Sequence, residues 1–371
     1  MAGFADLVKS KLPFVDRTSI QLITATSGLG FRASSSFGFM AKLNGGRSTE
    51  IVIATRGTAS AADVGTDLNT VPMRGPTGHL VHMGFGNTFK SYVTQLNAFI
   101  KQQNLGFKPT AVHCMGHSLG GALANLNAAA CAELGLNPYL YTVAAPRVGM
   151  LPYAEYLSKK VNQSHVHRVA NEADIVTMVP CFPFAHAPYD HGTHLLDGGM
   201  LSVNPLQHML NTGYIGMRDR SWAQLQSASR GKQQQLENSM YMAMDKDADY
   251  LQKLVHMPGV MFSSRMLKMI NLAISNLLDR LGAQSLLSVR LYGTGAFTVL
   301  DQLAEIIARH AQASQRGAKE VMGILNLVMR YLGRAAMAVK DASMLTIRWV
   351  FGLLHQSVNT MAKMALAMVG R

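Results

Sequence analysis

Short apolar runs bounded by turn residues characterise the first half of the chain. Residues 51–55, 110–115 and 139–144 are rich in Val, Ile, Thr and Tyr, so they predict buried strands. Residues 119–134 between the last two runs are Ala-rich and free of Pro, which favours a helix. Strand, tight turn, helix and strand in this order form a βαβ unit. We therefore expect a mostly parallel sheet flanked by helices over residues 19–216.

After Gly216 apolar residues recur at helical spacing, and Gly and Pro become rarer. In residues 266–281 the apolar side chains fall on one face, as in an amphipathic helix. Similar patterns recur in residues 299–307, 321–332 and 344–368. We predict an all-helical region that follows the sheet.

The length of 371 residues exceeds one average domain and agrees with this division. With 48% hydrophobic and 15% charged residues, the chain is not mostly disordered, because it can bury a sizeable core. We predict an N-terminal helical segment over residues 1–18, an α/β domain over 19–216 and a basic helical domain over 217–371.

The net charge of +13 indicates an anionic partner, either nucleic acid or an anionic membrane surface. Most of the excess lies after Gly216, where 19 Lys and Arg face 10 Asp and Glu. Because these cations are not interleaved with aromatic residues, we expect no nucleic-acid partner. Two uses of the helices remain open: packing on each other and on the α/β domain, or lying on an anionic membrane.

The three cysteines, Cys114, Cys131 and Cys181, have no metal-ligand spacing and predict neither a disulfide framework nor a zinc site. Asp and Lys interrupt residues 1–17, so this stretch lacks the apolar run of a secretory signal peptide. We therefore expect synthesis in the cytoplasm, with any export by a non-classical secretion system. No stretch reaches the roughly 18 apolar residues of a spanning helix.

Gly116, Ser118 and Gly120 form a Gly-x-Ser-x-Gly pattern between a predicted strand and a predicted helix. At so sharp a turn the serine takes a strained backbone, and its neighbours must be Gly because a side chain would collide with the strand or helix. Gly121 extends this requirement. The turn exposes the serine hydroxyl and leaves the Leu119 N–H at a helix N-terminus, where an oxyanion is favoured. The pattern predicts a nucleophilic serine.

Such a serine needs a histidine base and a carboxylate that orients the histidine, in the chain order Ser, Asp, His in α/β-hydrolases. Asp174 follows a predicted strand at the carboxyl edge of the sheet, where such sites form. The other downstream acids are Glu133, Glu155, Glu172, Asp190 and Asp197. Chain order alone leaves four histidines open: His186, His191, His194 and His208.

Several further segments, in order, resemble the class 3 lipases, a family named for fungal triacylglycerol lipases and related plant and bacterial enzymes. Residues 51–58 resemble the family's strand that ends in an oxyanion residue, residues 62–69 its lid helix and residues 81–85 the element after the lid. Residues 144–150 resemble its Pro-Arg-Val-Gly loop, and residues 171–180 its acid loop. The resemblance implies an α/β-hydrolase fold and a lipase-like catalytic domain.

Position by position, the resemblance implies that Ser118 is the nucleophile and Asp174 the orienting acid. It also implies that the N–H groups of Thr58 and Leu119 form the oxyanion hole. Acyl transfer through these groups requires no cofactor and no metal.

The family pattern also bears on the choice of histidine. A histidine soon after the acid loop is structural, and the catalytic one comes later, at a helix start followed by Tyr. This context favours His208, which precedes Tyr214 by six residues, over His191.

Other residues of the region invite alternative interpretations. The cluster of His186, Asp190, His191, His194 and Asp197 resembles a metal site, but its spacing matches no common ligand pattern, so solvated or supporting histidines are favoured.

The remaining polar residues near the motifs are expected to be structural. We expect His117 to pack rather than react, and Arg147 and Asp67 to hold loops. Thr55 and Val64 replace aromatic residues usual in the family, which leaves lid behaviour and acyl-chain preference open.

Together these features predict a carboxylic ester hydrolase that acts on lipids. The basic helices favour membrane glycerophospholipids, while a triacylglycerol lipase or carboxylesterase with a structural helical region is the alternative. A lipid-binding scaffold on an inactive hydrolase fold is the non-enzymatic alternative. The architecture also resembles bacterial phospholipase effectors, toxins injected into rival cells, for which an inhibitor or immunity protein and a secretion machine would be partners.

Overall fold

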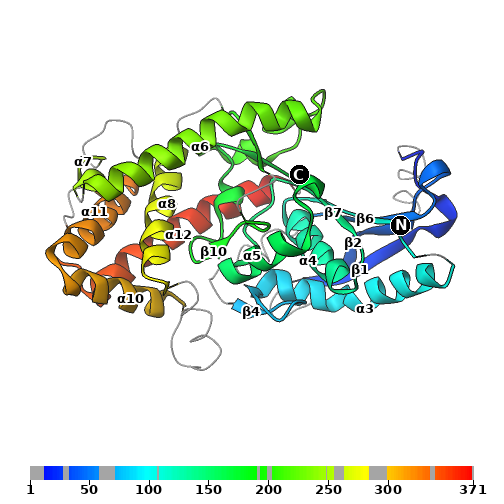
Figure 1. The fold of residues 1–371 in the computed structure, drawn as a ribbon, viewed down its shortest axis with the longest axis horizontal. Coiled ribbons are helices and arrows are strands. Elements are labelled where there is room, and N and C mark those ends of the chain that lie inside the picture. Colours follow the sequence, from blue (N-terminus) through cyan, green and yellow to red (C-terminus); the bar gives the residue numbers. More distant parts are fainter. Residues whose placement is uncertain are drawn as a thin grey trace.

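The computed structural model shows a β-sheet at one end of the molecule and a group of helices at the other (Figure 1). It describes residues 12–27, 33–57, 72–106, 108–189, 193–198, 203–247, 249–254, 263–283, 299–334 and 339–369. The predicted lid segment, 62–69, and most of the predicted N-terminal helical segment lie outside these ranges. The described part of that segment is not α-helical: Val15 forms a β-bridge with Leu43, and a 3-10 helix spans Arg17–Ser19.

A seven-stranded sheet in the order β1-β2-β3-β6-β7-β9-β11 forms the centre of the first region. All pairings from β3 to β11 are parallel, whereas β1 and β2 add antiparallel pairings at one edge. The strands are β1 (Gln21–Ser27), β2 (Ala33–Lys42), β3 (Glu50–Thr55), β6 (Ala111–His117), β7 (Pro138–Val143), β9 (Val166–Asn171) and β11 (Thr193–Leu196). The predicted mostly parallel sheet is confirmed.

Three helices share an apolar core with this sheet: α3 (Met83–Gly106), α4 (Leu119–Glu133) and α5 (Leu151–Lys160). In α4 every residue from Leu119 to Cys131 is buried, and most are Ala or Gly. Such small side chains let the helix lie close to the strands. A second, small sheet consists of β4 (Pro72–Arg74), β5 (Leu80–His82), β8 (Gly149–Met150) and β10 (Phe184–Ala185).

The helical region begins at α6, where Ser221 and Gln224 form a reciprocal capping box. Its helices are α6 (Trp222–Lys246), α7 (Tyr250–Leu254), α8 (Ser264–Arg280), α10 (Val299–Ala313), α11 (Gln315–Tyr331) and α12 (Met344–Val369). The four predicted helices after residue 260 correspond to α8, α10, α11 and α12 and are confirmed. The apolar faces of α8, α10 and α11 point inward, into one core cluster.

This cluster also includes loops of the sheet region. Leu277 of α8 and Phe351 of α12 belong to the same cluster as Ile175 and Val179, which follow β9. α12 contacts two short 3-10 helices in these loops, η4 (Ile175–Met178) and η5 (Pro205–His208). The helices after residue 216 thus share their core with the loops that follow the sheet.

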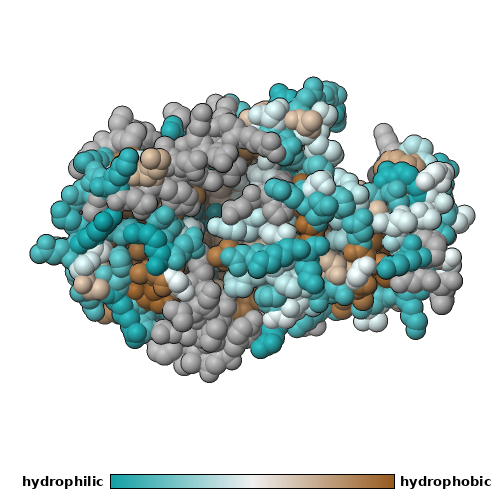
Figure 2. Space-filling view, viewed as in Figure 1, coloured by the Kyte–Doolittle hydropathy of each residue, from teal (hydrophilic) through white to brown (hydrophobic). Residues whose placement is uncertain are grey.

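The surface agrees with a folded chain of mixed polarity. On the face shown in Figure 2, hydrophilic residues dominate the described surface, and apolar residues gather in small, separate patches. Within the described ranges, each helix is either too short or insufficiently apolar to cross a bilayer.

Candidate active site

Ser118 occupies the sharp turn between β6 and α4. Its backbone has φ 58° and ψ −130°, a region that residues other than Gly rarely adopt. Such strain persists only where the surrounding structure imposes it, and it is typical of functional positions. The predicted strained elbow is confirmed.

The glycines around Ser118 permit this turn because nearby backbone leaves no space for a side chain. A Cβ atom on Gly116 would lie 2.1 Å from the Gly120 carbonyl oxygen, and one on Gly120 would lie 2.2 Å from the Thr55 oxygen. A Cβ on Gly121 would meet the Cβ of Ala145 at 2.7 Å. The predicted collision with the neighbouring helix and strand is therefore correct.

Thr55 reinforces the elbow in a way that the sequence did not reveal. Its buried hydroxyl donates to the Gly120 carbonyl at 2.7 Å, which ties the end of β3 to the first turn of α4. The available signal was a hydroxyl residue at the end of an otherwise apolar strand. The sequence showed it only as a replacement for the family's usual aromatic residue.

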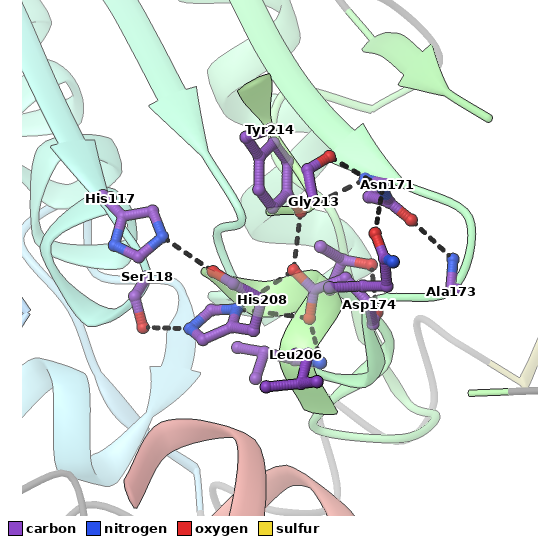
Figure 3. A network of polar contacts seen from close by, with 12 residues as sticks. His117, Ser118, Asn171, Ala173, Asp174, Leu206, His208, Gly213 and Tyr214 are labelled. Carbon is purple, nitrogen blue, oxygen red and sulfur yellow. Dashed lines mark hydrogen bonds and ion pairs between the residues drawn. The ribbon is translucent and has the colours of Figure 1, made fainter. Parts of the chain in front are cut away.

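Asp174, His208 and Ser118 form a continuous hydrogen-bonded chain (Figure 3). His208 Nε2 lies 2.8 Å from Ser118 Oγ, and His208 Nδ1 lies 3.0 Å from Asp174 Oδ2. All three side chains are almost completely buried, so the expectation that the turn exposes the serine hydroxyl is wrong for this structure. Asp174 caps η4 just beyond β9, and His208 ends η5, so two loops at the carboxyl edge of the sheet carry the partners of the serine. The structure thus brings together the three residues that the sequence singled out.

Two further groups hold the Asp174 carboxylate. The Val176 N–H donates to Oδ1 at 2.9 Å, and the Tyr214 hydroxyl donates to Oδ2 at 2.6 Å. Tyr214 also accepts a hydrogen bond from the Asn171 N–H at 3.1 Å. Burial raises the pKa of Tyr214 well above its ordinary value, so its hydroxyl remains a donor. The sequence drew attention to Tyr214 through its spacing from His208, but it did not predict the hydrogen bond from Tyr214 to Asp174.

Asn171 connects the two loops. Its side-chain amide donates to the Gly213 carbonyl at 2.8 Å and to Gln207 Oε1 at 3.1 Å. Its Oδ1 accepts from the Ala173 N–H at 2.9 Å. A single buried asparagine thereby joins the segment before Asp174 to the segment around His208.

His117 packs beside His208 and supports it through the backbone. Its Nε2 donates to the His208 carbonyl at 3.1 Å, and the two rings lie 5.1 Å apart. Burial lowers the pKa of His117 to about 4, so the ring is neutral near pH 7. This geometry agrees with the expectation that His117 packs rather than reacts.

Of the two residues expected to form the oxyanion hole, Leu119 lies within the described part of the structure and Thr58 does not. Leu119 is the first residue of α4, so its N–H is among those without a partner inside the helix. Thr58 lies outside the described residues. Gly57, directly before Thr58, lies beside the nucleophile, because a Cβ on Gly57 would be 3.5 Å from the Ser118 Cβ.

Among the described residues, the remaining candidates of the histidine cluster do not form a second centre. His194 pairs with His167, with 3.1 Å between Nε2 and Nδ1, while Asp190 and His191 lie outside the described residues. In the ranges that are described, no group of three or more His, Cys, Asp or Glu side chains is placed to hold a metal ion.

Arg147 holds a loop, as expected. Its half-buried guanidinium donates to the Pro180 carbonyl at 3.3 Å and to Asn271 Oδ1 of α8 at 3.1 Å. Arg147 therefore connects the loop after Asp174 to the helical region. Asp67 lies outside the described residues.

This arrangement can activate a hydroxyl group. His208 Nε2 can take the Ser118 proton, while Asp174 holds the Nδ1–H and stabilises the imidazolium that forms. The buried, preorganised hydrogen bonds require little rearrangement during reaction. The chemistry is that of nucleophilic acyl transfer.

Comparison with known proteins agrees with this geometry. Residues 52–184 match the model of the family "Lipase (class 3)". A "Lipase" of Rhizomucor miehei is 36% identical over 150 residues, which cover 37% of this chain and 40% of that protein. "Toxin TseL" of Vibrio cholerae serotype O1 is 28% identical over 213 residues, which cover 56% of this chain and 30% of that protein.

Among solved structures, the triacylglyceride lipase of Rhizomucor miehei aligns with a TM-score of 0.39 and 29% identity, covering 48% of this chain and 66% of that one. The chain thus spans less than half of the two relatives by sequence. The residues that match the family include the Ser118 elbow and, later in the chain, Asp174. Residues 52–184 of this chain therefore match the class 3 lipase family of α/β-hydrolases.

Proposed function

We propose that this protein hydrolyses carboxylic ester bonds of lipids, with Ser118 as nucleophile, His208 as general base and Asp174 as the orienting acid. The observation that carries the proposal is the hydrogen-bonded chain from Ser118 Oγ through His208 to Asp174, at 2.8 and 3.0 Å. An inactive scaffold would have no need to preserve this geometry on a strained elbow, so the non-enzymatic alternative is disfavoured.

The reaction proceeds in two steps. Ser118 Oγ attacks the ester carbonyl as its proton passes to His208 Nε2, and the Leu119 and Thr58 N–H groups stabilise the oxyanion. The tetrahedral intermediate expels the alcohol, which takes the proton from His208 and leaves an acyl-serine. Water, deprotonated by His208, then attacks the acyl-serine and releases the fatty acid and free Ser118.

As substrates we propose membrane glycerophospholipids. The net charge of +13 favours an anionic lipid surface, and a bacterial toxin is among the relatives. Triacylglycerol is the second candidate, because the Rhizomucor miehei relative, a "Lipase", is the more similar in sequence at 36% identity.

Hydrolysis of three substrates tests both candidates: vesicles of mixed-chain phosphatidylglycerol and phosphatidylethanolamine, a triacylglycerol emulsion, and a short soluble ester. We expect the wild type to release fatty acid from the vesicles and Ser118→Ala to release none, with products identified by mass spectrometry. Cleavage of the emulsion but not of the vesicles would support the triacylglycerol lipase instead. No cleavage of any ester would refute the hydrolase.

We also propose that the protein acts as a toxin on membranes of another bacterial cell, exported by a non-classical secretion system and restrained by an inhibitor in the producing cell. The similarity to "Toxin TseL" supports this proposal. Directing the wild type to the periplasm of a test bacterium should reduce its viability, whereas Ser118→Ala should not. Equal survival of both strains at equal protein levels would contradict the toxin role.

A further inference from the structure

α12 differs from α8, α10 and α11 in what its outer face presents. The apolar faces of α8, α10 and α11 are buried in the core cluster. α12 buries one face in the same cluster, but it also exposes Leu345 (76%), Trp349 (44%) and Met364 (48%). Their spacing along the helix places these three side chains on one line.

Uncharged residues continue this line. Gln356 and Thr360 are exposed between Trp349 and Met364, and Leu353 is half-buried beside them. We call Leu345, Trp349, Leu353, Gln356, Thr360 and Met364 the outer stripe of α12. An exposed stripe that carries three large apolar side chains and no charge is a candidate interaction surface.

The charge of α12 limits the kind of partner. The helix contains no Asp or Glu, and its charged side chains are Arg348 and Lys363. Arg348 is half-exposed and pairs with Asp301 of α10 at 2.9 Å. Lys340 and Asp341 are both exposed just before the helix. From Lys340 to Lys363 the cations Lys340, Arg348 and Lys363 outnumber the one carboxylate, Asp341, so an apolar surface on this segment complements an anionic lipid surface.

The position of α12 links this surface to the active site. The helix runs from the far end of the helical region to the centre of the molecule, where the C-terminus lies (Figure 1). There it contacts η5, which carries His208, and η4, which follows Asp174. Figure 3 shows α12 passing beside the Ser118 and His208 side chains.

We propose that the outer stripe of α12 is the surface through which this protein lies on an anionic bilayer. The helix lies in the plane of the interface, with Leu345, Trp349 and Met364 entering the acyl boundary and the cations near the lipid phosphates. Trp is well suited to this position because its ring is apolar and its N–H is polar. The proposal rests on the proposed lipid hydrolysis, because it brings His208 and Ser118 to the bilayer.

Vesicle binding by full-length protein tests the surface. In a Ser118→Ala background, which leaves the lipid intact, we compare Leu345→Gln/Trp349→Gln with the matched control Phe14→Gln/Met242→Gln. The control residues are similarly exposed, at 48% and 57%, but lie outside α12. The probes are vesicles of phosphatidylcholine with phosphatidylglycerol and vesicles of phosphatidylcholine alone.

We expect the α12 double variant to bind the anionic vesicles with an affinity at least about tenfold lower than that of the parent, because two apolar side chains no longer enter the lipid. The control should bind as the parent does. In the active protein, the same double variant should lower the ratio of vesicle to soluble-ester hydrolysis. Equal binding by both double variants, or equal binding to neutral and anionic vesicles, would overturn the proposal.

Fluorescence provides a measurement that leaves the stripe intact. The chain contains two tryptophans, so Trp222→Phe leaves Trp349 as the sole emitter. Anionic vesicles should shift its emission to shorter wavelength, and brominated lipid should quench it. Unchanged emission on vesicles that bind the protein would overturn the proposed surface.

The two proposals fail separately. A protein that binds vesicles through α12 but cleaves no ester refutes the hydrolase and not the surface. A protein that cleaves soluble ester while the double variant binds vesicles normally refutes the surface alone.

Discussion

The loops around Ser118 and the helices after residue 216 are both well buried, but different interactions hold them. In the loops, polar groups are fixed by directed hydrogen bonds, as when Asp174 accepts from His208, Val176 and Tyr214. In the helices, apolar side chains such as Leu277 and Leu325 are buried without directed contacts. Substitution in the loops should therefore change chemistry first, and substitution in the helices should change stability first.

The two regions are not independent, because they meet at the loop that follows Asp174. Asn271 of α8 accepts from Arg147, which also holds Pro180 in that loop. Lys268 of the same helix lies 3.8 Å from Glu172, just before Asp174. The helical region therefore packs against the catalytic loops and supports them.

The largest expected effect is on chemistry, from Asp174→Asn. Without the carboxylate, His208 loses both its orientation and the stabilisation of its charged form, so kcat on a soluble ester should fall about 10⁴-fold. The matched control is Glu172→Gln, two residues away and partly exposed, which should keep kcat within about twofold. A loss below about tenfold for Asp174→Asn would assign the orienting role to another acid.

Truncation of a core side chain in the helices should instead lower stability strongly and activity little. Leu277 is fully buried in α8, so Leu277→Ala should lower the free energy of unfolding by about 2–5 kcal/mol, while folded molecules keep most of their activity. Leu345→Ala removes the same atoms from a side chain that is 76% exposed and should change stability by less than about 0.5 kcal/mol. Urea unfolding measures both. Equal losses would mean that Leu277 does not belong to a cooperative core.

Tyr214→Phe removes the hydrogen bond to Asp174 without creating a cavity, because the ring remains. Removing the hydroxyl breaks a 2.6 Å hydrogen bond to a buried carboxylate, and kcat should fall about tenfold, with little change in KM. Tyr156→Phe, on the half-buried outer side of α5, is the control and should leave kcat unchanged. Parallel losses of kcat and of stability in Tyr214→Phe would make its role one of folding rather than of positioning Asp174.

The smallest effect concerns pH. Burial lowers the pKa of His194 to about 4 from an ordinary 6.5, so the unfolded chain binds more protons between these values. Stability should therefore be complete above pH 6.5 and fall as the pH drops toward 4. His194→Gln removes this group and should give a shallower decline of the urea midpoint over that range. An unchanged slope would show that other groups dominate acid unfolding.

The sequence by itself determined what depends on short-range sterics and periodicity. The Ser118 elbow follows from the Gly-x-Ser-x-Gly pattern between a strand and a helix, where a side chain on Gly116 would meet Gly120 only four residues away. The strands and the amphipathic helices follow from apolar spacing, and their observed bounds lie within a few residues of the predicted ones, except that α10 ends and α11 begins six residues outside the predicted ranges.

Only the tertiary structure decided what depends on residues distant in the chain. Chain order left four histidines open, and the fold brought His208 to Ser118 across 90 residues. The same is true of the bond from Thr55 to Gly120, 65 residues apart, and of the contact between α12 and η5. These contacts depend on how elements pack in three dimensions, and a pattern along one strand or helix does not contain that information.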